Sequence, residues 1–199
     1  METAAFEHSF FFFCHRKYCV GTANGLDALT LVLAAQKRNA GWPDGAEVIV
    51  PAMTFVATAQ AVVRAGLNPV FVDVDDHALL DISLFSKAIT SRTRAVIPVH
   101  LYGQLADMSE IWKIASSAGL FVLEDAAQAH GTAGKGPSHA LAFSFYPGKN
   151  LGALGDAGAV VTDDMELAET VRAMANYGSR KKYYHEMEGS NSRIDELQA

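Results

Sequence analysis

Apolar runs rich in β-branched residues alternate along the chain with segments whose apolar positions recur at helical spacing. This alternation is typical of βα units and predicts an α/β fold, a mostly parallel sheet flanked by helices. The predicted strands are residues 47–52, 69–74, 94–101, 120–123, 142–146 and 158–162. The predicted helices are residues 24–41, 54–65, 83–89, 108–118 and about 164–176.

Signals at the helix ends set several of these limits. Asn24 and Asp107 are N-cap candidates because their side-chain oxygens can accept hydrogen bonds from free first-turn amides. Gly41 and Gly119 end the same two helices. Residues 189–199 have the composition of one more helix, but the sequence stops before that helix could bury a face. We therefore interpret residues 1–199 as one truncated domain.

Composition and charge narrow the class of protein. The 199 residues are 50% hydrophobic and 19% charged, enough for one compact domain. A formal charge of −6 gives no electrostatic reason to expect nucleic acid or an anionic membrane as partner. No apolar run approaches the roughly 20 residues that span a bilayer. We expect a soluble cytoplasmic protein whose two cysteines stay reduced and hold no metal.

Polar residues that directly follow apolar runs are the candidates for chemistry, since ligands of open α/β sheets bind outside the carboxyl ends of the strands. Four places qualify: Asn24–Gly25, Thr54–Phe55, Glu124–Asp125 with Gln128, and Lys149. The sequence contains no P-loop, Rossmann glycine fingerprint, zinc-binding helix or nucleophile elbow.

Lys149 and Asp125 each allow a structural and a functional interpretation. A loop lysine is usually solvated and inert, and only a partly desolvated one becomes an amine nucleophile. Asp125 ends an apolar strand, where it would form a structural ion pair, cap a following helix or hold a protonated ligand nitrogen. Gln128 could face the same way from the first turn of that helix.

The other two places, Asn24–Gly25 and Thr54–Phe55, also allow more than one interpretation. Asn24 and Gly25 offer free amides and the positive end of a helix dipole to an anion, although capping alone also explains Asn24. Phe55 follows a buried strand, and an aromatic side chain there packs in a core more often than it forms a platform for a ligand ring.

Seven segments, in order, resemble one family, the pyridoxal-phosphate sugar aminotransferases of the DegT/DnrJ/EryC1/StrS group. They are ANGLDAL (23–29), VPAMTFVATAQAV (50–62), PVFVDVD (69–75), PVHLYGQLADM (98–108), LEDAAQAHG (123–131), FSFYPGKNLGALGDAGAVVT (143–162) and NYGSRKKYYHEMEGSNSRIDELQA (176–199). The resemblance covers nearly the whole chain. It implies the large domain of aspartate aminotransferase fold type I, with pyridoxal 5'-phosphate (PLP) as cofactor.

The resemblance also implies roles around the cofactor ring. Lys149 matches the lysine that forms a Schiff base with the cofactor, and Asp125 matches the acid that pairs with its pyridine nitrogen. Gln128 matches a residue near the phenolic oxygen, and Phe55 matches the aromatic that stacks on the ring. A carboxylate such as Asp125 keeps the ring nitrogen protonated and so maintains the electron sink.

Phosphate contacts and the quaternary state are implied in the same way. Ser144 and the amides of Gly25 and Leu26 match phosphate contacts. Asn191 matches a residue that reaches the phosphate of the partner subunit, so a homodimer is implied.

The family implies transfer of an amino group from L-glutamate to a keto sugar on a nucleoside diphosphate. ANGLDAL together with FSFYPGKNLGALGD looks most like the enzymes that act on 3-oxo hexoses linked to dTDP. The product would enter antibiotic sugars or surface polysaccharide such as lipopolysaccharide.

The chain departs from the family in three places. Residues 132–141 are shorter than usual, the carboxyl-terminal small domain is absent, and so is the segment before the helix that here contains Phe6 to Cys14. One alternative is therefore a truncated relative that binds PLP or a full-length partner without turnover. Another is a dehydratase, but those relatives carry histidine where this chain has Lys149.

Overall fold

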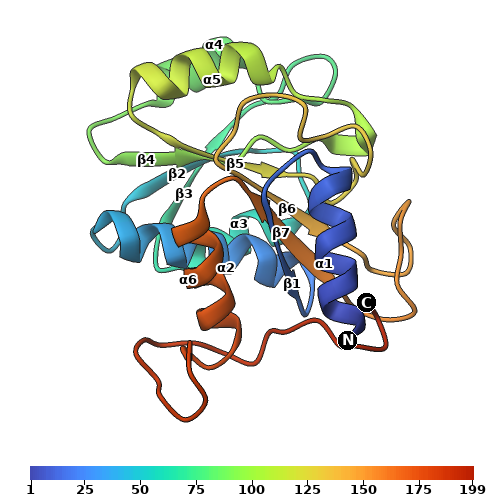
Figure 1. Ribbon diagram of the computed structural model, residues 1–199. Helices are drawn as coiled ribbons and strands as arrows, with labels where there is room; N and C mark the ends of the chain where they lie inside the picture. Colours follow the sequence, from blue (N-terminus) through green and yellow to red (C-terminus); the bar gives the residue numbers. More distant parts are fainter.

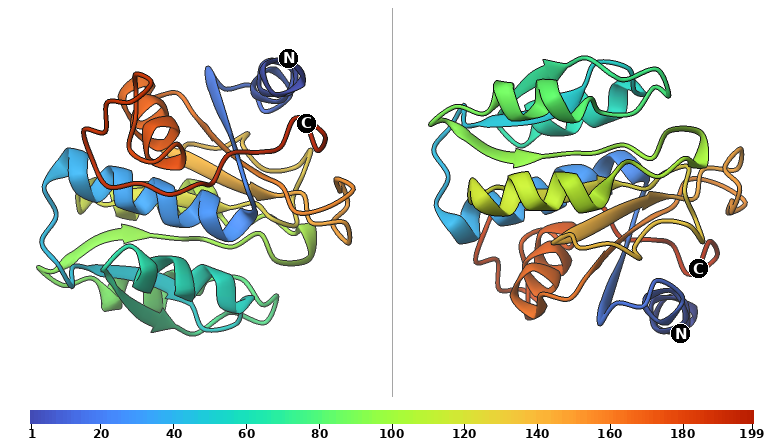
Figure 2. Two further views of the ribbon diagram at one scale, coloured as in Figure 1. Left: turned by 90° about the horizontal axis from the view of Figure 1, so that it is seen from below. Right: turned by 90° about the horizontal axis from the view of Figure 1, so that it is seen from above.

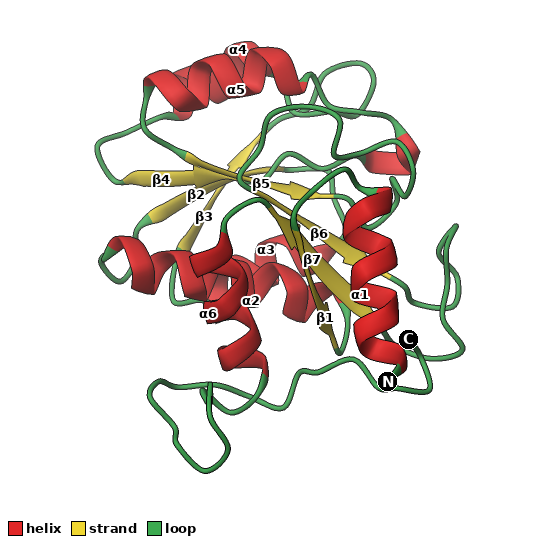
Figure 3. Ribbon diagram, viewed as in Figure 1, coloured by secondary structure: helices red, strands yellow, loops and turns green.

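The computed structural model describes all 199 residues and shows a single seven-stranded sheet with helices on both faces (Figures 1 and 3). The strands are β1 (Tyr18–Thr22), β2 (Glu47–Pro51), β3 (Asn68–Val72), β4 (Thr93–Val96), β5 (Phe121–Asp125), β6 (Ala140–Ser144) and β7 (Gly158–Thr162). The helices are α1 (Glu2–Phe13), α2 (Gly25–Ala40), α3 (Val56–Arg64), α4 (Ile82–Ala88), α5 (Met108–Ser117) and α6 (Met165–Ala175), with a 3-10 turn at Leu101–Gly103.

The sheet is mostly parallel, as predicted. Its strand order is β1-β7-β6-β5-β4-β2-β3, and only β7 runs against its two neighbours. All the other strands therefore end at the same edge of the sheet. This edge is where an open α/β sheet binds its ligands.

The strands are buried on both faces, which explains their continuous apolar runs. Helices α2, α3 and α6 cover one face, and α1, α4 and α5 cover the other (Figures 1 and 2). Along β6, for example, Ala140 and Ala142 belong to the core under α2, whereas Leu141 and Phe143 pack under α1.

The capping signals in the sequence set the helix boundaries. The Asn24 side-chain oxygen accepts from the Asp27 amide at 2.8 Å, and Gly41 adopts a left-handed φ of 65° behind α2. Asp107 accepts from the Glu110 amide at the start of α5. These predicted limits are confirmed within one or two residues.

Two predicted strands are displaced. The strand expected over residues 94–101 ends at Val96, because Pro98 has no amide for the ladder, although Val99 still forms an isolated bridge to Asp125. The strand expected over residues 142–146 begins two residues earlier, at Ala140, where it already pairs with Leu123.

Two expected helices are absent, so these predictions were wrong. Residues 126–134 form turns after Asp125, and Gly131 and Gly134 there have φ values of 83° and 87° that an α-helix does not accept. Residues 189–194 form no helix, since Asn191 and Arg193 bridge Asn176 and Thr22, and residues 195–199 form a single turn in which the Gln198 and Ala199 amides donate to the Asp195 carbonyl. Tertiary pairing thus overrides the local helical preference.

Helix α1 covers most of the helix that the resemblance implied over Phe6 to Cys14, whereas β1 was not among the predicted ranges. The Thr3 amide donates to Glu196 at 3.0 Å, so the two ends of the chain lie side by side (Figure 1).

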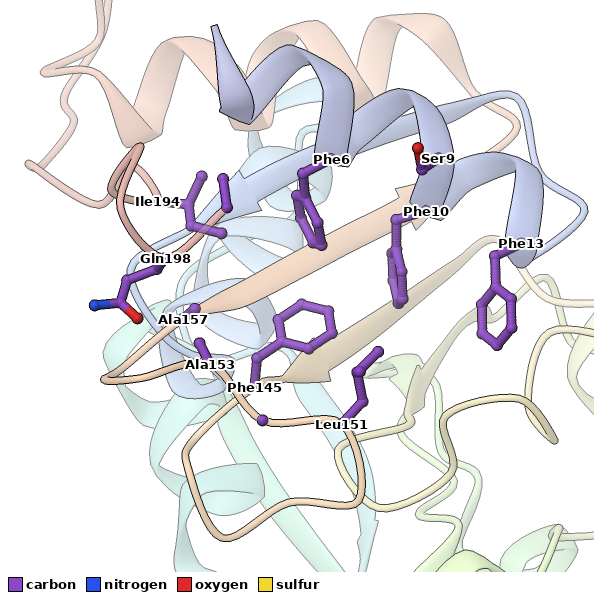
Figure 4. A pocket seen from close by; sticks show the side chains of 12 residues that line it. Phe6, Ser9, Phe10, Phe13, Phe145, Leu151, Ala153, Ala157, Ile194 and Gln198 are labelled. Atoms are coloured by element: carbon purple, nitrogen blue, oxygen red, sulfur yellow. The ribbon is translucent and has the colours of Figure 1, made fainter.

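An apolar cavity of about 420 Å³ separates α1 from the loop after β6, and no candidate residue lines it (Figure 4). None of the helices combines the length and the apolar composition that crossing a bilayer needs.

Candidate active site

The carboxyl ends of β1, β2, β5 and β6 bring most of the candidate residues to one edge of the sheet. Gly25 follows β1, Phe55 follows β2, Asp125 is the last residue of β5, and Ser144 ends β6 shortly before Lys149. Residues that lie far apart in the sequence therefore share one location because the strands are parallel.

The start of α2 forms an anion cradle with the end of β6. A Cβ built on Gly25 would lie 2.6 Å from the Ser144 Cβ, so only glycine lets the helix approach this strand. Neither Gly25 nor Leu26 uses its amide in a hydrogen bond within the chain. The side chain of Leu26 packs against the core, which leaves its amide as the group available to a ligand.

Asp125 is a buried carboxylate without a cation partner. Its side chain accepts from the Thr58 hydroxyl at 2.8 Å and from the Ala127 amide at 3.2 Å, and the residue is 6% exposed. Asp125 takes part in none of the ion pairs of the structure. Burial raises the pKa of Asp125, while the two hydrogen bonds and then the Lys149 charge lower it. A cationic ligand atom here would remove the cost of an unpaired buried charge.

Lys149 lies in the loop after β6 and is half-buried. Its amide donates to the Tyr146 carbonyl at 2.8 Å, which closes a turn. The ammonium forms no ion pair, yet it is close enough to lower the pKa of both Asp125 and His130. Lys149 and Asp125 therefore lie on the same side of the molecule, at the carboxyl edge of the sheet.

Phe55 is exposed, which contradicts the alternative that it packs in the core. It precedes the first residue of α3, and 71% of the residue is accessible. Thr58 lies three residues further on, in the first turn of α3, and donates to Asp125. Phe55 thus offers an accessible ring at the start of the helix that holds Asp125 in place.

Gln128 is oriented by the turn at Leu101–Gly103. Its Oε1 accepts from the Tyr102 amide at 2.6 Å, and Tyr102 has a φ of 57° there. Because the oxygen is engaged, the Nε2 group is the one left to donate to a ligand. Gln128 reaches this position from a turn rather than from the helix expected after Asp125.

Asn191 does not join the other candidates through any contact. It bridges Asn176 beyond the end of α6 and is exposed, and its side chain makes no hydrogen bond within the chain. Its neighbour Ser192 is buried and donates to Asp27 in the first turn of α2 at 2.8 Å.

Three side chains that fix the end of β5 beneath the site were not predicted from the sequence: His100, Glu124 and Arg16. His100 lies fully buried with its Nε2 at 2.7 Å from Glu124, while the Ala106 amide donates to its Nδ1 at 3.1 Å. His100 therefore donates from Nε2, and the Arg16 guanidinium lies 3.8 Å from the same carboxylate. Glu124 thus forms the structural ion pair that Asp125 lacks, and it does so on the opposite face of β5.

No group of three or more histidine, cysteine, aspartate or glutamate side chains is arranged to hold a metal ion. The site consists of five groups: the Lys149 amine, the buried Asp125 carboxylate, the Gln128 amide donor, the exposed Phe55 ring and the anion cradle at Gly25.

Comparison with known proteins gives matches over the whole chain. Residues 1–199 match the profile of the DegT/DnrJ/EryC1/StrS aminotransferase family. The dTDP-3-amino-3,4,6-trideoxy-alpha-D-glucose transaminase of Streptomyces venezuelae is 52% identical over 204 residues, which cover 100% of this chain and 53% of that protein. The UDP-N-acetyl-3-dehydro-alpha-D-glucosamine 3-aminotransferase of Acidithiobacillus ferrooxidans is 50% identical and covers 90% of this chain and 49% of its own length.

Solved structures agree with these matches. DesV of S. venezuelae superposes on the whole chain with a TM-score of 0.93 at 50% identity, and the match covers 54% of DesV. NtdA of Bacillus subtilis, solved with bound cofactor PMP, gives a TM-score of 0.94 at 36% identity over all of this chain and 46% of NtdA. The chain spans about half the length of the relatives that it matches.

Proposed function

Because the chain belongs to the DegT/DnrJ/EryC1/StrS aminotransferase family, we propose that it takes part in amino transfer to a nucleotide-linked keto sugar, with PLP as cofactor. Relatives at about 50% identity are named as transaminases of dTDP-linked and UDP-linked sugars. The observation that carries the proposal is the buried, unpaired carboxylate of Asp125 within reach of the Lys149 charge.

The residues present fit the cofactor group by group. Asp125 supplies the anion that a protonated ring nitrogen needs, and Phe55 supplies an exposed aromatic face for the ring. Gln128 has a free amide donor for a phenolic oxygen, since its carbonyl oxygen is engaged by Tyr102. The amides of Gly25 and Leu26 and the hydroxyl of Ser144 supply the donors that a phosphate requires.

Asp125 would act by charge. When bound, PLP supplies an electron sink for the charge that develops at the α-carbon of an amino donor. The Asp125 carboxylate would hold a proton on the ring nitrogen, and its buried position strengthens that pairing because little water screens it. Thr58 keeps the carboxylate in place through its 2.8 Å hydrogen bond.

Lys149 would act as both tether and base. Its Nζ would hold the cofactor and be released by the incoming amine, and it would then move a proton from the donor's α-carbon to C4′ of the cofactor. A lysine suits this task because burial and neighbouring charges readily change its protonation. The dehydratase relatives carry a histidine at this position, and histidine cannot form the tether. The presence of Lys149 therefore argues against a dehydratase.

We propose L-glutamate as the donor and a 3-oxo hexose linked to dTDP as the acceptor. The dTDP preference is supported by the 52% identity with the S. venezuelae transaminase. The product would enter an antibiotic sugar or a surface polysaccharide. A homodimer is proposed as well, in which the exposed Asn191 reaches the phosphate held by the partner chain.

A half-reaction tests this proposal. PLP-loaded chain, freed of excess cofactor, is mixed with L-glutamate, and 2-oxoglutarate is measured against the amount of bound cofactor. We expect one equivalent of 2-oxoglutarate, followed by recovery of the visible absorbance when a dTDP-linked 3-oxo hexose is added. L-Alanine and L-aspartate serve as matched donors. Absence of any keto acid from all three donors would contradict the proposed activity.

A further inference from the structure

We propose that His130 is a positioning residue for Lys149: together with Asn150 it fastens the loop that carries Lys149 to the turn that follows Asp125. This inference rests on the function proposed above for Lys149. We call the His130–Asn150 contact the loop latch.

The latch consists of two hydrogen bonds between segments that lie 20 residues apart. The Asn150 Nδ2 donates to the His130 carbonyl at 3.4 Å, and the His130 Nδ1 lies 2.6 Å from the Asn150 Oδ1. Because the amide nitrogen faces a carbonyl, the amide oxygen must face the ring. The proton of the imidazole therefore resides on Nδ1, which donates to Asn150.

The ring of His130 is fixed by its surroundings. It is 9% exposed and packs against Phe143 and Phe145, each with a ring-centroid distance of 5.3 Å. Its Nε2 is buried without any partner. Burial lowers the pKa of His130, so the ring stays neutral near pH 7 and keeps the single N–H that the latch uses.

The loop has little else to hold it against the Asp125 side of the site. The backbone hydrogen bonds of Lys149 and Ala153 go to Tyr146 and Phe145, which belong to the same end of β6. No other hydrogen bond joins residues 126–131 to residues 147–152.

Apolar packing does not hold the loop in place of further hydrogen bonds. The apolar cavity of about 420 Å³ lies behind the loop, with Leu151 at its edge (Figure 4). Leu151 remains 47% exposed, so the loop is not clamped from that side. The position of Lys149, which directly precedes Asn150, therefore depends on the latch.

Proteolysis of the cofactor-free chain tests the latch, because trypsin cleaves after lysine and Lys149 lies in the latched loop. The key variants are His130→Gln, His130→Asn and Asn150→Leu. The amide nitrogen of asparagine lies where Nδ1 lies in histidine, whereas that of glutamine lies near Nε2. We expect His130→Gln to raise the rate of cleavage at Lys149 about fivefold, as loss of one neutral hydrogen bond implies, and Asn150→Leu to raise it further because it removes both bonds. His130→Asn should restore nearly the original rate.

His139→Phe is the matched control. His139 is exposed, but its ring, like that of His130, packs against phenylalanine: it stacks on Phe121 at the start of β5, at the opposite edge of the sheet. Its replacement should leave cleavage at Lys149 unchanged at a temperature where circular dichroism shows every variant folded. Equal cleavage in His130→Gln, Asn150→Leu and His139→Phe, or no rescue by His130→Asn, would overturn the latch.

Borohydride trapping of PLP separates this inference from the proposed function. The rate at which label accumulates on Lys149 should fall severalfold in His130→Gln and recover in His130→Asn. A chain that traps no cofactor at all would contradict the proposed function, and the proteolysis rates would still decide whether the latch exists.

Discussion

Thr58→Val tests the electrostatic role of the buried carboxylate. Thr58 is fully buried and donates to the Asp125 Oδ2 at 2.8 Å, so valine removes the donor with little change in shape. A hydrogen bond to a charged acceptor is worth about 1.5–3 kcal/mol, against about 1 kcal/mol for a neutral one. We expect the cofactor-free variant to lose about 2 kcal/mol of unfolding free energy at pH 8. That loss corresponds to a fall of roughly 4–8 °C in Tm.

The pH dependence of this loss follows from the pKa of Asp125. Burial raises that pKa, so the folded chain keeps the Asp125 proton to a higher pH than the unfolded chain does. The contribution of Asp125 to stability is therefore greatest at low pH and declines as pH rises through the folded-state pKa. Thr58→Val raises that pKa further, because the hydroxyl was lowering it. The gap between the variant and the original protein should widen from pH 4 to pH 8.

Urea denaturation followed by circular dichroism measures this gap. Thr162→Val is the matched control, since Thr162 is equally buried but donates to the neutral carbonyl of His139 at 2.7 Å. Its loss should be about 1 kcal/mol at every pH. A Thr58→Val loss that is independent of pH, or that shrinks as pH rises, would refute the reasoning.

Four further substitutions give distinct expectations for the proposed site. Lys149→Ala should abolish amino transfer in the half-reaction assay, and Asp125→Asn should slow it by orders of magnitude while cofactor still binds; unchanged transfer by either would exclude its role. Phe55→Leu should weaken PLP binding about fivefold in an equilibrium titration, since ring stacking contributes about 1 kcal/mol. Asn191→Ala should weaken PLP binding only under conditions where sedimentation shows a dimer, and it should leave urea stability unchanged because its side chain makes no hydrogen bond within the chain.

The sequence predicts the location of the site better than its details. Alternating apolar runs predict a parallel sheet, and the carboxyl-edge rule then brings Asp125 and Lys149 together without any structure. The Thr58 partner of Asp125 lies 67 residues away, so no local pattern reveals it. The exposure of Phe55 likewise depends on which face of α3 meets the sheet.

Two segments could not be predicted from their own apolar patterns. Helix α1 carries phenylalanine on several sides, so it lacks the one-sided apolar stripe that identifies a surface helix, and only the family resemblance indicated it. Residues 189–199 were expected to be helical, but bridges to β1 and to the end of α6 keep residues 191–193 out of a helix, and only one turn forms at the carboxyl end. In both cases contacts with distant segments decide the structure.

Site mapping of the trapped cofactor tests whether Lys149 is the residue that binds PLP. The 199-residue chain is incubated with PLP, reduced with borohydride and digested, and the labelled peptide is sequenced by mass spectrometry. We expect a single label, on Lys149. A label on Lys135 or Lys113, or no label at all, would contradict it.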